Sequence, residues 1–224
     1  MYRKRRFDLE THYPEEMDVP EVRHLCRYLF LHDTHTLAES SLLEETIPKR
    51  FGEVAGFRPE LEAFSYGETP PPLIFRLLRE VEASSQDVFL DLGSGCGGPT
   101  LLAAHQVARA VGVDLVPAAV EFARSCASEL GLGRAEFREE DLLETDLGEA
   151  TILYCSATAV SRWLRQKLED RWLECRPGAR IITAGYAVET PGVEVLAHRS
   201  YPLSWTGYGP GQRIDFFLHR RGGD

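Results

Sequence analysis

A turn at residues 91–98 holds the side chains in this sequence best suited to binding chemistry. It follows a short apolar run, opens with Asp91 and places four glycines in the next seven positions, three of them with the spacing G-x-G-x-x-G. This is the dinucleotide fingerprint when a strand precedes it, a helix follows it and an acid lies about twenty residues on. Asp114 is such an acid, at the end of the next predicted strand, and its carboxylate suits ribose hydroxyls.

Asp91 discriminates between the nucleotides that this turn could bind. A carboxylate at the mouth of the turn repels a pyrophosphate and competes with the anion site at a helix start, which disfavours NAD. S-adenosylmethionine has no phosphate and carries an ammonium and a sulfonium, whose charges Asp91 can offset directly or through water. The turn therefore favours S-adenosylmethionine, and an NAD-dependent oxidoreductase is the weakest alternative.

Asp141 follows the third predicted strand, where it would border an adenine ring. Its carboxylate could accept a hydrogen bond from the exocyclic amine, with Leu142 supplying an apolar face. The alternative is a solvated surface acid, because Glu139 and Glu140 precede it.

From residue 73 the apolar pattern alternates between strand and helix periodicity. Strands are predicted at 88–91, 110–114, 135–138, 150–156 and 179–184, and helices at 72–82, 98–108, 117–130 and 161–173. Such alternation with short turns predicts an α/β fold with a doubly wound, mostly parallel sheet. Two further β-rich runs, 193–201 and 212–219, have no helix between them and predict an antiparallel pair at the sheet edge.

The N-terminal third has a different character. Residues 20–47 have helical periodicity, and 48–72 are rich in proline and aromatic residues, which is typical of a lid or binding loop. We expect a helical extension at 1–47, a lid or cofactor loop at 48–72 and the core at 73–224. The histidines and the cysteine of the first segment match no zinc spacing, so no metal site is expected.

Composition limits the classes of protein. The chain is 43% hydrophobic and 27% charged, which suits a packed core without disulfides. Its five scattered cysteines indicate reduced thiols, and a net charge of −10 disfavours nucleic-acid binding. No apolar run approaches the roughly 18 residues of a membrane span, and the basic N-terminus lacks the apolar stretch of a signal peptide. A cytoplasmic location and no membrane association are expected.

Two further motifs flank the glycine turn. Tyr66-Gly67-Glu68-Thr69 lies about twenty residues before the first strand, and Ser204-Trp205-Thr206-Gly207 lies late in the chain, before Phe217-Leu218-His219. In this order and spacing they resemble the non-SET histone lysine methyltransferases, the disruptor-of-telomeric-silencing type, over residues 48–220. The resemblance implies a Rossmann-like, seven-stranded class I methyltransferase sheet that uses S-adenosylmethionine as cofactor.

The resemblance also implies roles for individual residues. Residues 66–69 would cover the methionine end of the cofactor, with Thr69 facing the transfer site, and Trp205 would wall the channel by which the nucleophile enters. Asp91 with its glycines would hold the methionine moiety, Asp114 the ribose, and Asp141 with Leu142 the adenine. The expected cofactor-binding set is Tyr66, Gly67, Glu68, Asp91, Gly93, Ser94, Gly95, Asp114, Leu115, Asp141 and Leu142.

The sequence departs from this family on the acceptor side. Gly98 replaces a glutamine, Ser156 replaces the first of two asparagines, and Phe216 replaces a channel tyrosine; the family's basic tail has no counterpart before Asp224. Cofactor binding is therefore expected to carry over, but histone lysine as the acceptor is not. Gly98 is interpreted as a sign of a rebuilt acceptor side. Ser156 and Phe216, with Thr69 and Trp205, are the expected channel walls.

Three functions follow from these patterns. The first is methyl transfer to a lysine or similar amine of a non-nucleosomal protein, by in-line displacement, without a dedicated base; in particular, His219 is not expected to be one. The second is a small-molecule N- or O-methyltransferase with a lidded apolar pocket. The third is an S-adenosylmethionine-binding module without catalysis.

Overall fold

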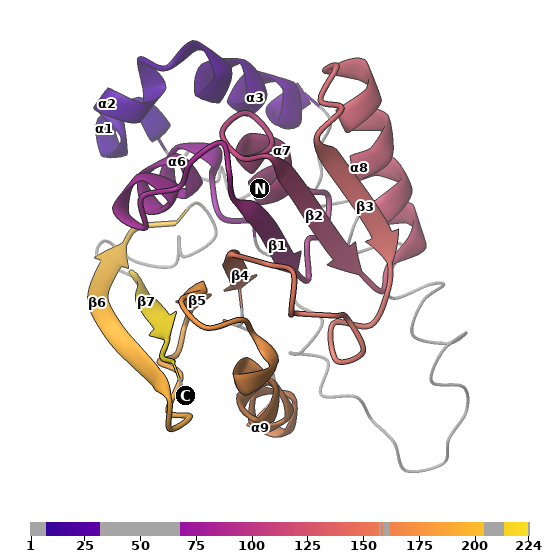
Figure 1. Ribbon diagram of the computed structural model, residues 1–224. Coiled ribbons are helices and arrows are strands. Elements are labelled where there is room, and N and C mark those ends of the chain that lie inside the picture. The colour runs from indigo at the N-terminus through magenta and orange to yellow at the C-terminus, as the bar shows by residue number, and fades with distance from the viewer. Residues whose placement is uncertain (1–7, 32–67, 157, 159–161, 204–212, 224) are drawn as a thin grey trace, which may run out of the picture.

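A seven-stranded sheet forms the centre of the protein in the computed structural model, which describes residues 8–31, 68–156, 158, 162–203 and 213–223 (Figure 1). The strand order is β3-β2-β1-β4-β5-β7-β6. Strands β1 to β5 pair in parallel, and β7 pairs antiparallel with both β5 and β6. The strands are β1 Val88–Leu92, β2 Arg109–Asp114, β3 Ala135–Glu139, β4 Ile152–Ser156, β5 Arg180–Ala184, β6 Val193–Tyr201 and β7 Ile214–Arg221. The predicted α/β sheet with an antiparallel edge pair is confirmed.

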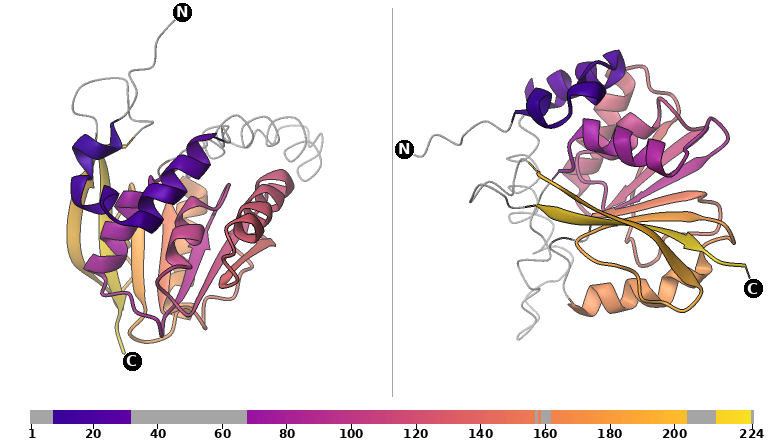
Figure 2. Two further views of the ribbon diagram at one scale, coloured as in Figure 1. Left: turned by 90° about the horizontal axis from the view of Figure 1, so that it is seen from above. Right: turned by 90° about the vertical axis from the view of Figure 1, so that its left-hand side faces the viewer.

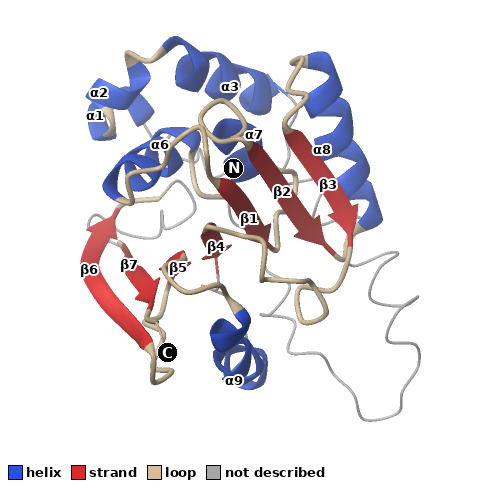
Figure 3. Cartoon of the chain, viewed as in Figure 1, coloured by secondary structure: helices blue, strands red, loops and turns tan. Residues whose placement is uncertain are grey.

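Helices cover both faces of this sheet (Figures 2 and 3). They are α1 Leu9–His12, α2 Pro14–Met17, α3 Pro20–Leu31, α6 Pro71–Glu80, α7 Gly98–Ala103, α8 Pro117–Glu129, α9 Arg162–Arg171 and the 3-10 helix η3 Trp172–Glu174. One apolar core lies between the sheet and α3, α6, α7 and α8, and a second lies between the sheet and α9 with η3. Helix α7 ends before the predicted residue 108, because the Ala108 N–H already donates to the Asp87 carbonyl at 2.9 Å, where the chain turns into β2.

The N-terminal helices belong to the first of these cores. Tyr13, Leu25 and Leu29 are buried in the same cluster as the apolar residues of α6 and α7. The Tyr13 hydroxyl donates to the Pro202 carbonyl at 2.9 Å, which joins α1 and α2 to the chain beyond β6. The proposed division at residues 47 and 72 stays a prediction, since residues 32–67 lie outside the described part.

The strand order reverses between β1 and β4. In an open α/β sheet such a reversal leaves a crevice outside the carboxyl ends of the two strands, where ligands bind. The residues at these ends are Asp91 and Leu92 on β1 and Cys155 and Ser156 on β4. In the register of the two strands, Asp91 pairs with Tyr154 and Leu92 pairs with Cys155. Within the described ranges, no helix combines the length and apolar character that crossing a bilayer requires.

Candidate active site

The glycine turn bends back over the end of β2. The N–H groups of Gly93 and Ser94 both donate to the Val113 carbonyl at 2.9 Å. Gly97 has φ +88°, and a Cβ there would lie 2.7 Å from the Phe137 ring, so only glycine fits. The turn is thereby pressed onto β2 and β3, and its backbone is held rigidly at the carboxyl edge of the sheet.

Asp91 is a buried carboxylate with one oxygen unused. Its side chain is 1% exposed, and Oδ2 accepts a hydrogen bond from the Thr100 hydroxyl at 2.8 Å. Among the described residues, Oδ1 is buried and accepts no hydrogen bond. Burial raises the pKa of Asp91 to about 7, with a further contribution from the Asp114 carboxylate and opposition from the Thr100 hydrogen bond. A buried acceptor of this kind requires a donor, and a ligand ammonium would be one.

Asp114 braces the turn from the end of β2. Its Oδ2 accepts from the Gly95 N–H at 2.8 Å and its Oδ1 from the Val116 N–H at 2.9 Å. Each carboxylate oxygen has a second lone pair, so both can still accept from a ligand hydroxyl. Burial raises the pKa of Asp114 above its usual range, and the backbone hydrogen bonds oppose this. Leu115 follows it and is half-buried.

Asp141 and Leu142 lie in the loop after β3, and Leu142 faces the glycine turn. Leu142 Cδ2 is 4.0 Å from the point that a Cβ on Gly93 would occupy. Asp141 Oδ1 accepts from the Leu143 N–H at 2.8 Å, which closes the loop locally. The structure thus places Leu142 beside the glycine turn, at the edge of the crevice.

Two buried hydroxyls meet near the end of β4. Thr69 is 2% exposed, and its Oγ1 is 2.6 Å from the hydroxyl of Tyr154, the register partner of Asp91. Tyr154 was not predicted as a site residue. The sequence feature that could have indicated Tyr154 is a hydroxyl in the otherwise apolar run Ile152-Leu153-Tyr154-Cys155. This run forms β4, which lies next to β1 where the strand order reverses. Ser156 ends the same strand and is half-buried.

Two predictions about the acceptor side need comment. Gly98 faces α3, where a Cβ would lie at an ordinary contact distance of 3.5 Å from Leu29 Cδ1, so its interpretation as a sign of a rebuilt acceptor side stays a prediction. Phe216 is fully buried in the core, with its ring 5.9 Å from that of Tyr201 in an edge-to-face contact. Its role as a channel wall stays a prediction.

Other predicted residues are placed only in part. Glu68 is half-buried, Ser94 is buried, and Ser94 Oγ has no hydrogen-bond partner within the described part. Tyr66, Gly67 and Trp205 lie outside the described residues.

His219 is held as a structural hydrogen-bonding group. It is fully buried, the Val188 N–H donates to its Nε2 at 3.0 Å, and its Nδ1 lies 3.1 Å from the Ile181 carbonyl. Nε2 must be the acceptor, so Nδ1 carries the proton and donates to Ile181. Both ring nitrogens are therefore occupied, and neither can take a proton from a methyl acceptor.

Replacing His219 with leucine should lower the free energy of unfolding by about 1–3 kcal/mol, because a buried N–H and a buried carbonyl lose their partners. Burial lowers the pKa of His219 below its usual 6.5, so the unfolded chain takes up the proton first and the wild type loses stability as pH falls below 6.5. Urea unfolding at pH 7.5 and 5.5 should show this loss in the wild type and a smaller loss in His219→Leu. His198→Gln, at a half-exposed histidine, serves as the control. Lost methyl transfer with unchanged stability would contradict the structural role.

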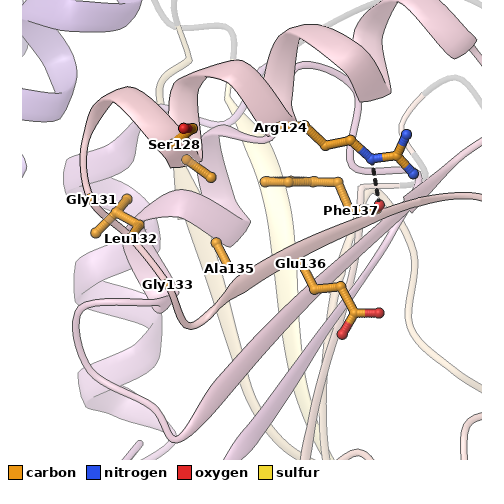
Figure 4. A pocket seen from close by; sticks show the side chains of 9 residues that line it. Arg124, Ser128, Gly131, Leu132, Gly133, Ala135, Glu136 and Phe137 are labelled. Carbon is orange, nitrogen blue, oxygen red and sulfur yellow. Dashed lines mark hydrogen bonds between the residues drawn. The ribbon is translucent and has the colours of Figure 1, made fainter.

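A groove of about 520 Å³ lies elsewhere, between the end of α8 and the start of β3 (Figure 4). Arg124 spans it, with Nε donating to the Phe137 carbonyl at 2.9 Å. The groove opens near Gly131 and Gly133, which precede β3, so it lies toward the amino end of that strand. It is not part of the crevice formed by Asp91, Asp114 and Leu142.

Comparison with known proteins identifies the domain. Residues 91–194 match the family model described as the ANTKMT methyltransferase domain. The chain carries a methyltransferase domain. The matched stretch begins at Asp91 and contains Asp114, Asp141 and Ser156. The residues that line the crevice from β1 to β4 are thus those of the methyltransferase domain, whereas Thr69 and β7 lie outside the match.

Curated relatives support the resemblance found in the motifs. The histone-lysine N-methyltransferase, H3 lysine-79 specific, of Yarrowia lipolytica is 26% identical over 183 residues, 67% of this chain and 37% of that protein. The Drosophila melanogaster protein of the same name is 24% identical over 152 residues, 61% of this chain and 8% of that protein. The chain therefore spans well under half the length of these relatives. The methyltransferase domain is distantly similar to them.

A solved structure shows the same architecture. An RNA methyltransferase from Salinibacter ruber, in complex with S-adenosyl-L-homocysteine, superposes with a TM-score of 0.57 at 26% identity and covers 70% of this chain and 95% of its own. The methyltransferase domain has the class I fold, as the motif resemblance implied.

Proposed function

We propose that the chain binds S-adenosylmethionine at the carboxyl ends of β1, β2 and β3 and transfers its methyl group to a lysine or similar amine of a non-nucleosomal protein. The observation that carries the cofactor assignment is the buried Oδ1 of Asp91, which accepts no hydrogen bond from the described residues. The cofactor's ammonium fits this acceptor. The ribose hydroxyls would donate hydrogen bonds to Asp114. The adenine would contact Leu142, and Asp141 would lie beside the adenine.

The chain's own contribution to the reaction is alignment. Bound S-adenosylmethionine supplies a methyl group on a sulfonium, and the acceptor must approach in line with the breaking bond. Holding both reactants in this geometry can contribute roughly 7 to 11 kcal/mol to the lowering of the barrier. Thr69, fixed by Tyr154 beside Asp91, is placed to shape the methionine end of the site. An amine acceptor would lose its proton through burial, which lowers its pKa from about 10.4.

Charge supports a cationic acceptor. The chain has a net charge of −10, and three consecutive acids, Glu139, Glu140 and Asp141, stand at the end of β3. A net negative charge attracts a lysine-bearing segment and repels the phosphates of RNA or DNA. Two curated relatives are named as histone-lysine N-methyltransferases, which is consistent with an amine acceptor.

A small-molecule acceptor is the second candidate. The observation that favours it is the half-buried Ser156 at the end of β4, where the resembling family has a longer amide side chain. A shorter side chain leaves room for a flat or apolar acceptor.

The experiment that tests the proposal follows a labelled methyl group. The purified chain is incubated with S-adenosyl-[methyl-³H]methionine and a cell lysate, and the products are separated into protein, nucleic-acid and small-molecule fractions. We expect label in protein, recovered as methyllysine after acid hydrolysis, and none with Asp91→Asn. Label in the small-molecule fraction would support the second candidate, and label in nucleic acid would contradict both. Label in none of them, despite tight cofactor binding, would indicate a non-catalytic module.

A further inference from the structure

Arg171, the last residue of α9, reaches across to the loop that follows β3. Its Nη1 donates to the Leu142 carbonyl at 2.8 Å, and its Nη2 donates to the Thr145 carbonyl. The side chain is only 14% exposed, so water competes weakly for these donors. A guanidinium holds two carbonyls at once because its N–H groups form a rigid planar fork.

The loop has little other support. It has no strand pairing, and it is closed by Thr145, whose N–H and Oγ1 donate to the Asp141 carbonyl at 3.1 and 3.0 Å. These internal bonds fix the shape of the loop but not its position on the sheet. The start of the loop is held at β2, where the Glu140 N–H donates to the Asp114 carbonyl at 3.1 Å. The rest is positioned from α9, through Arg171, and through the packing of Leu142 and Leu143 on the apolar core beneath them.

Leu142 therefore makes contacts through both its backbone carbonyl and its side chain. Its carbonyl accepts a hydrogen bond from Arg171, and its side chain lies beside Gly93. A shift of this loop would move the Leu142 side chain, which the adenine of the proposed cofactor would contact.

We infer that Arg171 is a positioning residue for the adenine half of the cofactor, acting through the carbonyls of Leu142 and Thr145. This inference rests on the proposed function, because it assumes that an adenosine moiety contacts Leu142. Lysine in place of Arg171 could reach one carbonyl but could not span both.

The ion pair of Arg171 with Glu174 offers a matched control. Arg171 Nη2 lies 2.6 Å from Glu174 Oε2, but the Glu174 side chain is 51% exposed. An exposed pair of this kind contributes little to stability. Glu174→Gln therefore removes the ionic partner of Arg171 and leaves the two carbonyl hydrogen bonds in place.

The test compares two ligands by isothermal titration calorimetry. S-adenosylhomocysteine carries the adenosine and the amino acid, whereas 5′-methylthioadenosine carries the adenosine without the amino acid. Arg171→Gln and Arg171→Lys should weaken both ligands by the same factor, about tenfold or more for the loss of buried charge-assisted hydrogen bonds. Glu174→Gln should bind both within twofold of wild type. Asp91→Asn should weaken S-adenosylhomocysteine alone, since the other ligand has no ammonium.

The outcomes separate this inference from the proposed function. A wild type that binds neither ligand would refute the proposed function. A wild type that binds both, with Arg171 variants of unchanged affinity or with a loss confined to S-adenosylhomocysteine, would overturn the role of Arg171 alone. Hydrogen exchange on the wild type covers the case in which the variants do not fold. Amides of residues 142–145 must gain protection when 5′-methylthioadenosine binds, and unchanged exchange there would also overturn the inference.

Discussion

Asp91→Asn should lose most of the affinity for S-adenosylhomocysteine and should also make the ligand-free protein more stable. Its unused Oδ1 would accept the ligand ammonium, and a buried charge-assisted hydrogen bond is worth about 1.5–3 kcal/mol, or roughly 10- to 100-fold in affinity. The same carboxylate destabilises the ligand-free fold, because burial has raised its pKa from 3.8 to about 7.

The pH dependence follows from the direction of this shift. A carboxyl group with a raised pKa contributes its stability below pH 3.8, and that contribution is lost as pH rises through about 7. At pH 8 the buried charge therefore destabilises the wild type fully. Asp91→Asn should have a free energy of unfolding about 1–3 kcal/mol higher, which is less than the whole pKa shift corresponds to, because burying the asparagine amide also costs free energy. Near pH 4 the two proteins should differ little.

Ligand affinity should change in the opposite sense. Only the ionised Asp91 can pair with an ammonium, so wild-type affinity should fall about tenfold per pH unit below about pH 7. Calorimetric titrations at pH 8, 7 and 6 measure this, and Asp91→Asn should show no such trend. Asp146→Asn, at an exposed acid, should behave as the wild type in both assays. Unchanged affinity in Asp91→Asn would refute the assignment of the glycine turn as the cofactor site.

Arg76→Ala should be among the most destabilising single changes in the chain. Arg76 on α6 donates from Nε and Nη2 to the two carboxylate oxygens of Glu16 at 2.7 and 2.8 Å. The Glu16 side chain is 2% exposed and that of Arg76 is 31% exposed, so the carboxylate is the buried end of the pair. Removing one member of a buried ion pair leaves an uncompensated charge and typically costs about 3–5 kcal/mol.

Two tyrosines extend this contact. The guanidinium of Arg76 lies 5.3 Å from the ring centre of Tyr13 and 5.7 Å from that of Tyr201, within the range of a cation–π interaction. Tyr13 in turn donates to the Pro202 carbonyl. Arg76 therefore connects α1 and α2 to α6, which directly follows Thr69, and to the end of β6. We expect Arg76→Ala to loosen the N-terminal helices before the sheet unfolds.

Urea denaturation followed by circular dichroism measures the loss. Arg199→Ala is the matched control, because Arg199 is 47% exposed and pairs with Glu80 at 3.0 Å, so its loss should stay within about 1 kcal/mol. Early proteolytic cleavage within residues 8–31 in Arg76→Ala would show which helices are released. A free energy of unfolding equal to that of Arg199→Ala would disprove the importance of the buried pair.

Local patterns in the sequence were sufficient for most of the fold. Residues 193–201 were predicted as a strand and form β6, and the helix predicted at 117–130 is α8, begun by Pro117. Alternating periodicity and punctuation by glycine and proline act over a few residues, so they can be recognised without the tertiary structure. Asp91 and Asp114 could be assigned for the same reason: each stands at the end of a predicted strand, and parallel strands end at one edge of the sheet.

The contacts that complete the site depend on residues far apart in the chain. Thr69 and Tyr154 are 85 residues apart, and Arg171 and Leu142 are 29 apart. No periodicity links such pairs, because their distance is set by how the helices pack on the two faces of the sheet. Gly98 shows the same limit, because its contact with Leu29 on α3 could not be predicted from the sequence. The sequence alone determined the sheet, the glycine turn and its acids; only the tertiary structure decided which side chains hold them in place, because packing between distant segments leaves no local pattern.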